Sequence, residues 1–170
     1  ARPKMPPSSK LRAGEIAAHR LLDHEDVTPQ TTIAAAAERT REAARGHTVL
    51  LIQDTTEINF SGADRSRTGL GPAGDGKALG FFIHPLLAVS LEDEAVLGLL
   101  HAQIWSREAA PAADRKTRPV EAKESMRWLN ATEASASLVG VAAEVIDVSD
   151  REGDIYQHFA RRPEDVGMVV

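Results

Sequence analysis

The chain has 170 residues, of which 42% are hydrophobic, and this is enough for one domain with a hydrophobic core. It contains no cysteine, which excludes disulfides and thiolate metal sites and fits a cytoplasmic protein. The net charge of −5 argues against a simple nucleic-acid binder, and no apolar run is long enough to span a membrane.

The first part of the chain is predicted to be helical after a short lead-in. Residues 1–10 contain three prolines and no periodicity, so we expect a disordered segment. Apolar residues recur at helical spacing over 11–25, and an alanine-rich helix is expected from Pro29 to Ala44. Thr28 suits the N-cap of this second helix, with Pro29 at its first position. Residues 11–46 therefore form a helical segment in this interpretation.

Residues 47–170 alternate between strand and helix patterns. Strands are expected at 48–53, 81–90, 95–106 and 144–149, and from 167 onward; helices are expected at about 121–138 and 154–161. Residues 57–80 have the composition of a long polar loop. Pro85 cannot donate a ladder hydrogen bond, so we expect a bulge or an unpaired side there.

The order strand, strand, strand, helix, strand, helix, strand predicts an α/β fold with a mixed sheet. The first three strands suit an antiparallel meander, because a short acidic turn at 92–94 joins the second to the third. The helix then returns the chain by a right-handed crossover, so that the strand at 144–149 lies parallel to the strand at 48–53.

Two aspartates follow the two strands that this topology makes neighbours. Asp54 follows the first strand and Asp150 the fourth, and adjacent strands lie about 4.8 Å apart. Carboxylates are ligands for Mg2+ or Mn2+, so the pair predicts a metal site. Two alternatives involve no metal. Asp54 can form an ordinary turn with the residues after it, and Ser149 with Glu152 fits a helix capping box.

The glycine-rich stretch contains two patterns that resemble nucleotide-binding loops. Residues 69–74 match G-x-G-x-x-G, and residues 71–77 match G-x-x-x-x-G-K. The first needs a strand before it and a helix after it, and the second needs Ser or Thr where Ala78 stands. A loop near the aspartates is the better interpretation, with Arg65, Arg67 and Lys77 as candidate DNA contacts.

The sequence resembles the DDE-type transposases of bacterial insertion sequences. The stretches that carry the resemblance are 49–57 (VLLIQDTTE), 80–84 (GFFIH), 98–101 (GLLH), 121–125 (EAKES) with Trp128 and Leu129, and 148–155 (VSDREGDI). They occur in the family's order and at about its spacing. Residues 16–30 are similar to the segment that links the family's N-terminal DNA-binding region to its catalytic core.

This resemblance implies a ribonuclease-H-like core over residues 47–170 that uses Mg2+ or Mn2+ to cleave and transfer DNA strands. Asp54 and Asp150 would be the first two members of the catalytic triad and its metal ligands. The third is a glutamate in a Y-x2-R-x3-E-x6-K signature, which does not occur before Val170. We therefore expect a truncated core that is inactive, or nearly so, by itself. The partners would be transposon ends and target DNA, with a homodimer in the synaptic complex and no membrane.

Three other functions stay open on the sequence. The chain can be a DNA- or partner-binding remnant without catalysis, or a stand-alone ribonuclease-H-like nuclease. A nucleotide-binding protein is the third, and it would depend on Lys77.

Overall fold

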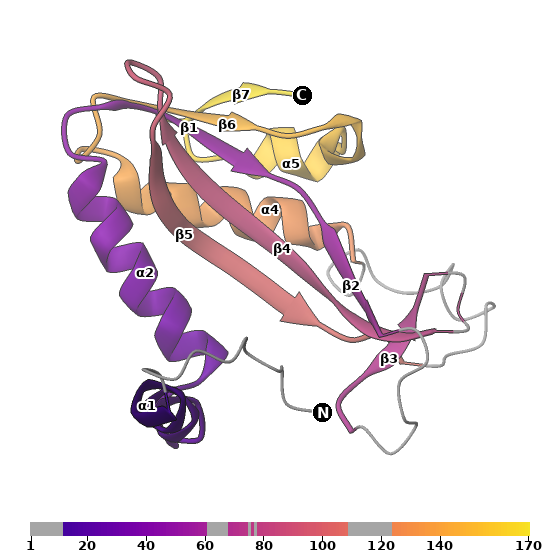
Figure 1. The fold of residues 1–170 in the computed structure, drawn as a ribbon. Coiled ribbons are helices and arrows are strands. Elements are labelled where there is room, and N and C mark those ends of the chain that lie inside the picture. Colours follow the sequence, from indigo (N-terminus) through magenta and orange to yellow (C-terminus); the bar gives the residue numbers. More distant parts are fainter. Residues whose placement is uncertain (1–11, 61–67, 75, 77, 109–123) are drawn as a thin grey trace.

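The computed structural model describes residues 12–60, 68–74, 76, 78–108 and 124–170. Over these residues the protein is α/β, with a mixed open sheet of seven strands and four α-helices (Figure 1). The expected lead-in at 1–10 lies outside the described residues. None of the helices described is both long enough and apolar enough to cross a membrane.

Two helices precede the sheet, as the sequence predicts. They are α1 (Arg12–Leu22) and α2 (Pro29–Ala43). Thr28 caps α2, because its hydroxyl accepts a hydrogen bond from the Thr31 amide at 3.1 Å and the Thr31 side chain returns one to the Thr28 amide at 3.0 Å. No residue of α1 is buried, whereas α2 packs along the edge strand β5 (Val96–Trp105).

The sheet is built around β1 (Thr48–Gln53). On one side β1 pairs antiparallel with β4 (Ala78–Ser90), which pairs antiparallel with β5. On the other side β1 pairs parallel with β6 (Glu144–Val148), and β6 pairs parallel with β7 (Gly167–Val169). The predicted meander and the predicted parallel pairing of the first and fourth expected strands are both confirmed.

The expectation of a long loop over 57–80 is wrong in part. The structure places β2 (Thr56–Phe60) and β3 (Gly71–Ala73) there, and β4 already begins at Ala78. Both short strands pair with β4, so tertiary pairing outweighs the polar and glycine-rich composition. Gly80 permits this close approach, because a Cβ at that position would lie 2.2 Å from the Ile58 carbonyl oxygen.

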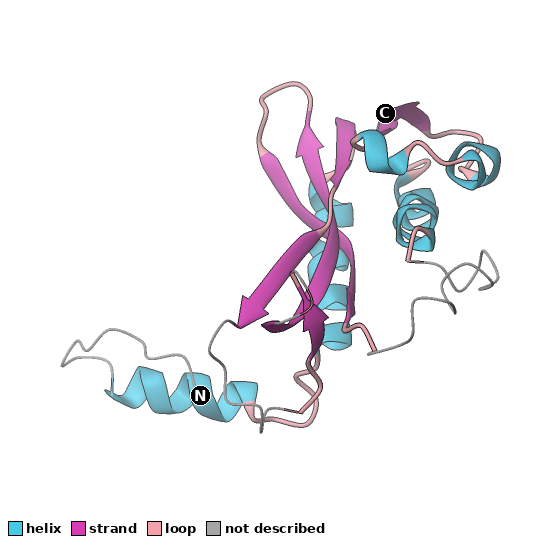
Figure 2. Ribbon diagram, turned by 90° about the vertical axis from the view of Figure 1, so that its right-hand side faces the viewer, coloured by secondary structure: helices cyan, strands magenta, loops and turns pink. Residues whose placement is uncertain are grey.

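Two further helices follow the meander. The expected helix at 121–138 is α4 (Met126–Ser135), continued by a 3-10 turn at Ala136–Leu138; residues 121–123 lie outside the described part of the chain. The expected helix at 154–161 begins later, as α5 (Tyr156–Arg161), and a 3-10 turn at Arg151–Gly153 precedes it. Helix α4 lies against one face of the sheet (Figures 1 and 2).

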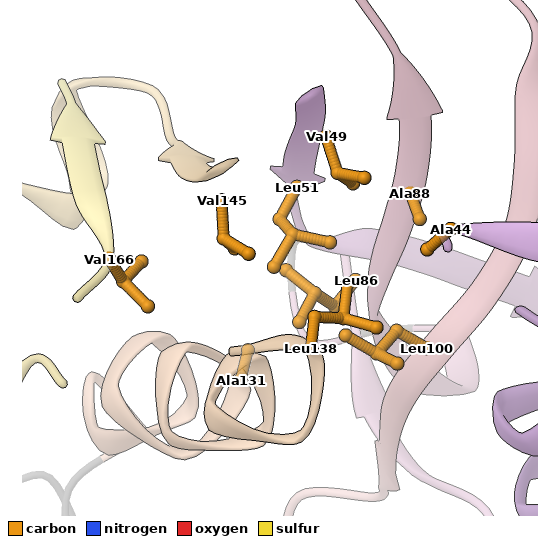
Figure 3. Close-up of a cluster of buried hydrophobic side chains, with 10 residues drawn as sticks. All are labelled: Ala44, Val49, Leu51, Leu86, Ala88, Leu100, Ala131, Leu138, Val145 and Val166. Carbon is orange, nitrogen blue, oxygen red and sulfur yellow. The ribbon is translucent and has the colours of Figure 1, made fainter. Parts of the chain in front are cut away.

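The hydrophobic core lies between the sheet and α4 (Figure 3). Every second residue of β1 faces it, so Val49 and Leu51 are fully buried while Ile52 is 42% exposed. Burial of a leucine of this kind contributes about 2 kcal/mol. The buried cluster consists of Ala44, Val49, Leu51, Leu86, Ala88, Leu100, Ala131, Leu138, Val145 and Val166.

Candidate functional site

The parallel pairing of β1 with β6 brings the segments that carry Asp54 and Asp150 together. Leu50 pairs with Ile146, and Ile52 pairs with Val148. The two strands therefore end side by side, Asp54 one residue after Gln53 of β1 and Asp150 two residues after Val148 of β6. Both residues are exposed. That their carboxylates share a metal ion stays a prediction.

Each aspartate already uses one carboxylate oxygen to order the backbone that follows it. Asp54 Oδ1 accepts a hydrogen bond from the Thr55 amide at 2.6 Å, and Asp150 Oδ1 accepts one from the Glu152 amide at 2.9 Å. Asp150 is thus the N-cap of the 3-10 turn, and the alternative with Ser149 as the cap is wrong. Ser149 is buried, and its hydroxyl has no partner among the described residues. The second oxygen of either aspartate forms no hydrogen bond or ion pair within the described ranges.

Asp54 sits at an interruption between two collinear strands. Gln53, the last residue of β1, pairs with Leu86, and Thr56, the first residue of β2, pairs with Ile83. In this register Asp54 lies opposite Pro85, which has no N–H to donate. Pro85 does pair on its other side, with Ala102 of β5. The expected unpaired side at Pro85 is confirmed, and it releases the backbone of Asp54 from the ladder.

A polar pocket of about 240 Å³ opens beside Asp54. Arg107 forms part of the pocket wall. It donates two hydrogen bonds of 2.7 and 2.6 Å to Glu124, and its guanidinium lies 4.1 Å from the centre of the Phe82 ring. Such a bidentate pair is geometrically well defined. The pocket is lined by Asp54, Thr55, Glu57, Phe82, Trp105, Arg107, Glu124, Arg127 and Glu152.

Arg127 of α4 joins the segments that follow β1 and β6. Its Nε donates a hydrogen bond to the Thr55 hydroxyl at 2.6 Å, and its terminal nitrogen binds the Glu152 carboxylate at 2.9 Å. The Arg127 side chain is only 12% exposed, so its contacts are more strongly held than those of a surface ion pair. One arginine therefore contacts the residue after Asp54 and the turn capped by Asp150.

A buried chain of polar side chains lies directly beneath these segments. The Thr55 hydroxyl is 2.9 Å from His84 Nδ1, and His84 Nε2 is 3.0 Å from Gln53 Oε1. Gln53 Nε2 donates to Asp147 Oδ1 at 2.6 Å and to the Thr132 hydroxyl at 3.0 Å. All of these residues except Thr55 are at most 2% exposed.

The chain ends at His158 of α5. The Thr132 hydroxyl makes a short hydrogen bond with Asp147 Oδ2 and lies 2.6 Å from His158 Nε2. His158 Nδ1 is 2.9 Å from the Gly153 carbonyl oxygen, in the turn capped by Asp150. The network thus begins and ends at the two segments that carry the aspartates.

The pKa values of the two buried histidines, His84 and His158, are shifted in opposite directions. Burial, together with the charge of Arg127, lowers the pKa of His84 to about 4, so this imidazole is neutral. Burial also opposes a charge on His158, but the Asp147 carboxylate, 3.9 Å from Nε2, and the hydrogen bond to the Gly153 carbonyl outweigh it and raise the pKa of His158. His84 is fully buried in β4 and hydrogen-bonded at both ring nitrogens.

The metal site stays a prediction. Two hard carboxylate donors that follow adjacent strands suit Mg2+ or Mn2+. However, no cluster of three or more His, Cys, Asp or Glu side chains that could hold a metal occurs among the residues that the structure describes. The candidate DNA contacts Arg65, Arg67 and Lys77 all lie outside these residues.

Sequence reasoning did not identify the polar network as functional. The signal available to it was a polar residue at an inward position of an apolar strand, as at Gln53 of β1 and Asp147 of β6. Thr132 and Arg127 lie on α4, where polar and apolar residues are mixed and neither stands out. Only the fold shows which side chains they contact. No known protein-family model matches this chain.

Proposed function

We propose that this chain is part of the catalytic core of a DDE-type DNA transposase with a ribonuclease-H-like fold. The sheet topology supports this fold. A meander of three antiparallel strands is followed by a helix, a strand parallel to the first, another helix and a further parallel strand, which is the predicted order. Strands β2 and β3 extend the meander without altering that order.

The observation that carries the proposal is the parallel β1–β6 register, because it places the carboxyl ends of the strands that precede Asp54 and Asp150 side by side. Asp54 and Asp150 would hold Mg2+ or Mn2+. Such an ion activates water and stabilises charge at a phosphodiester. The chain's own part is to keep the two carboxylates fixed, and to this end each orders the backbone after it.

The proposed partner is DNA at the transposon ends and the target, with two copies of the protein in the synaptic complex. Arg107 and Arg127 line the pocket beside Asp54, each paired with a glutamate, and they are the basic side chains that a phosphate backbone entering this pocket would meet. Arg65, Arg67 and Lys77 are proposed as further DNA contacts, and the cytoplasm as the location. The Y-x2-R-x3-E-x6-K signature does not occur in these 170 residues, so we expect cleavage by this chain alone to be weak or absent.

Calorimetric titration with Mn2+ tests the metal site without requiring activity. We expect the wild-type chain to bind Mn2+, and Asp54→Ala or Asp150→Ala to weaken binding at least tenfold. Asp154→Ala is the matched control, because Asp154 is an exposed acid in the same region and its removal changes the net charge equally. Unchanged binding in both Asp54→Ala and Asp150→Ala would refute the site.

A DNA assay separates the competing functions. A labelled duplex is incubated with the chain and Mn2+, and both binding and strand cleavage are measured. Binding without cleavage fits the proposed core. Hydrolysis by the chain alone that requires both aspartates would replace it with a stand-alone nuclease, and absence of both DNA and Mn2+ binding would overturn it.

A further inference from the structure

The directions of the hydrogen bonds in the buried network follow from which atoms can donate. Asp147 accepts at both oxygens, so the Gln53 group that faces it must be the amide nitrogen, and Gln53 Oε1 must face His84. His84 Nε2 therefore carries a proton and donates it. His84 Nδ1 then accepts from the Thr55 hydroxyl, which itself accepts from Arg127.

The same reasoning assigns the protons at the other end of the network. The Thr132 hydroxyl has one proton, and its short hydrogen bond to Asp147 takes it. His158 Nε2 must then donate to the Thr132 oxygen, while His158 Nδ1 donates to the Gly153 carbonyl. An imidazole that donates at both nitrogens is an imidazolium. With His158 charged, each of these side chains has a partner for every donor.

On this basis we propose that the chain of hydrogen bonds from Arg127 to His158, with His158 as an imidazolium, is a positioning device for the segments that carry Asp54 and Asp150. This inference rests on the proposed metal site. Gln53 and Thr55 flank Asp54 and are both held by the network. Glu152 and Gly153 follow Asp150 and contact the two ends of the network. Arg127 binds the Glu152 carboxylate, and His158 binds the Gly153 carbonyl oxygen.

The network has features of a support rather than of a ligand set. Its central members, from Gln53 to His158, are buried, whereas Thr55 and Arg127 at its outer end line the pocket beside Asp54. The charge of Asp147, on β6, helps to raise the pKa of His158. The pKa of His84, on β4, is raised slightly by Asp147 and lowered slightly by His158. Hydrogen-bond partners behind metal ligands commonly change metal affinity by 10- to 100-fold when they are removed.

Thr132 offers a matched pair of substitutions at the junction of the network. Thr132→Ser keeps the hydroxyl, whereas Thr132→Val keeps the shape and removes it. We expect Thr132→Val to weaken Mn2+ binding about tenfold and Thr132→Ser to stay within about twofold of wild type. Circular dichroism verifies that both are folded. Wild-type Mn2+ affinity in a folded Thr132→Val protein would overturn the positioning role.

Arg127→Lys tests the end of the network at Arg127. It carries less risk to folding because it keeps the positive charge, yet a lysine cannot contact Thr55 and Glu152 in the same geometry. We expect Mn2+ affinity to fall several-fold, and Arg45→Lys in the turn after α2, which alters a surface pair with Glu42, to leave it unchanged. Unchanged affinity in Arg127→Lys would contradict the proposal.

Nitrogen NMR of the histidine side chains tests the proton assignment separately. At pH 6.5 we expect His158 to be protonated at both nitrogens and His84 at Nε2 only, with the second His158 proton lost in Thr132→Val. A neutral His158 beside a protonated Asp147 would overturn the assignment. If wild-type protein fails to bind Mn2+ but shows these signals, the proposed metal site fails while the buried hydrogen-bond assignment stands.

Discussion

The neutral, buried His84 makes a specific prediction about stability in mild acid. His84 is fully buried, and its pKa is lowered to about 4 from the ordinary value of 6.5. As the pH falls below 6.5, the unfolded chain takes up a proton at this histidine that the folded protein excludes until about pH 4. The folded state is therefore progressively destabilised over this range, and linkage gives a loss of about 2 kcal/mol between pH 7 and pH 5.

Urea unfolding at several pH values measures this loss. We expect His84→Gln to have a flatter dependence of the unfolding free energy on pH, by about 2 kcal/mol over the same interval. His24→Gln serves as the control, because His24 is an exposed histidine with a side chain that is 58% accessible. The raised pKa of His158 contributes stability that is lost only as the pH rises above 6.5, so its effect falls mainly outside this range. Parallel pH curves for wild type and His84→Gln would refute the reasoning.

Two further predictions concern packing. Gly98 has φ +147°, and a Cβ there would lie 2.3 Å from the Thr40 hydroxyl oxygen, so Gly98→Ala should cost about 2–3 kcal/mol and less in a Thr40→Ala background. Equal costs in both backgrounds, measured by urea unfolding, would contradict this clash. Leu51→Ala should cost about 3 kcal/mol because Leu51 is fully buried, whereas Leu91→Ala, at a residue 51% exposed, should cost under about 0.5 kcal/mol. Similar losses at the two positions would show that Leu51 is not in the core.

The sequence predicts those features that depend on local chemistry. Thr28 and Pro29 begin α2 because a hydroxyl cap and a fixed φ act within one turn. Pro85 marks the unpaired side of β4 because a missing N–H needs no knowledge of the partner strand. The parallel pairing of β1 with β6 was predicted because a helix between the third and fourth expected strands allows the chain to return in the same direction, and the structure confirms it.

The features that the sequence does not predict depend on distant partners. β2 and β3 are short and polar, and they exist because β4 is long enough to pair with them. The 3-10 turn after Asp150 starts before the predicted helix because the Asp150 carboxylate caps it directly. The contact of Arg127 with Thr55 joins residues that are 72 positions apart, and no local pattern indicates it.

The composition of the network is itself an argument for its role. A buried ion pair such as Asp147 with His158 is weak grounds for stability, because well-packed apolar residues of similar volume often stabilise a core equally well. Such a pair does impose direction, since each hydrogen bond is satisfied only when its partners are at fixed distances and angles. Apolar packing beneath β1 and β6 would hold the strands together, but it would leave the residues after Gln53 and Ser149 free to shift. The proposed metal site, with two carboxylates on segments that follow separate strands, would tolerate little such shift, and a directional support at this point in the sheet would limit it.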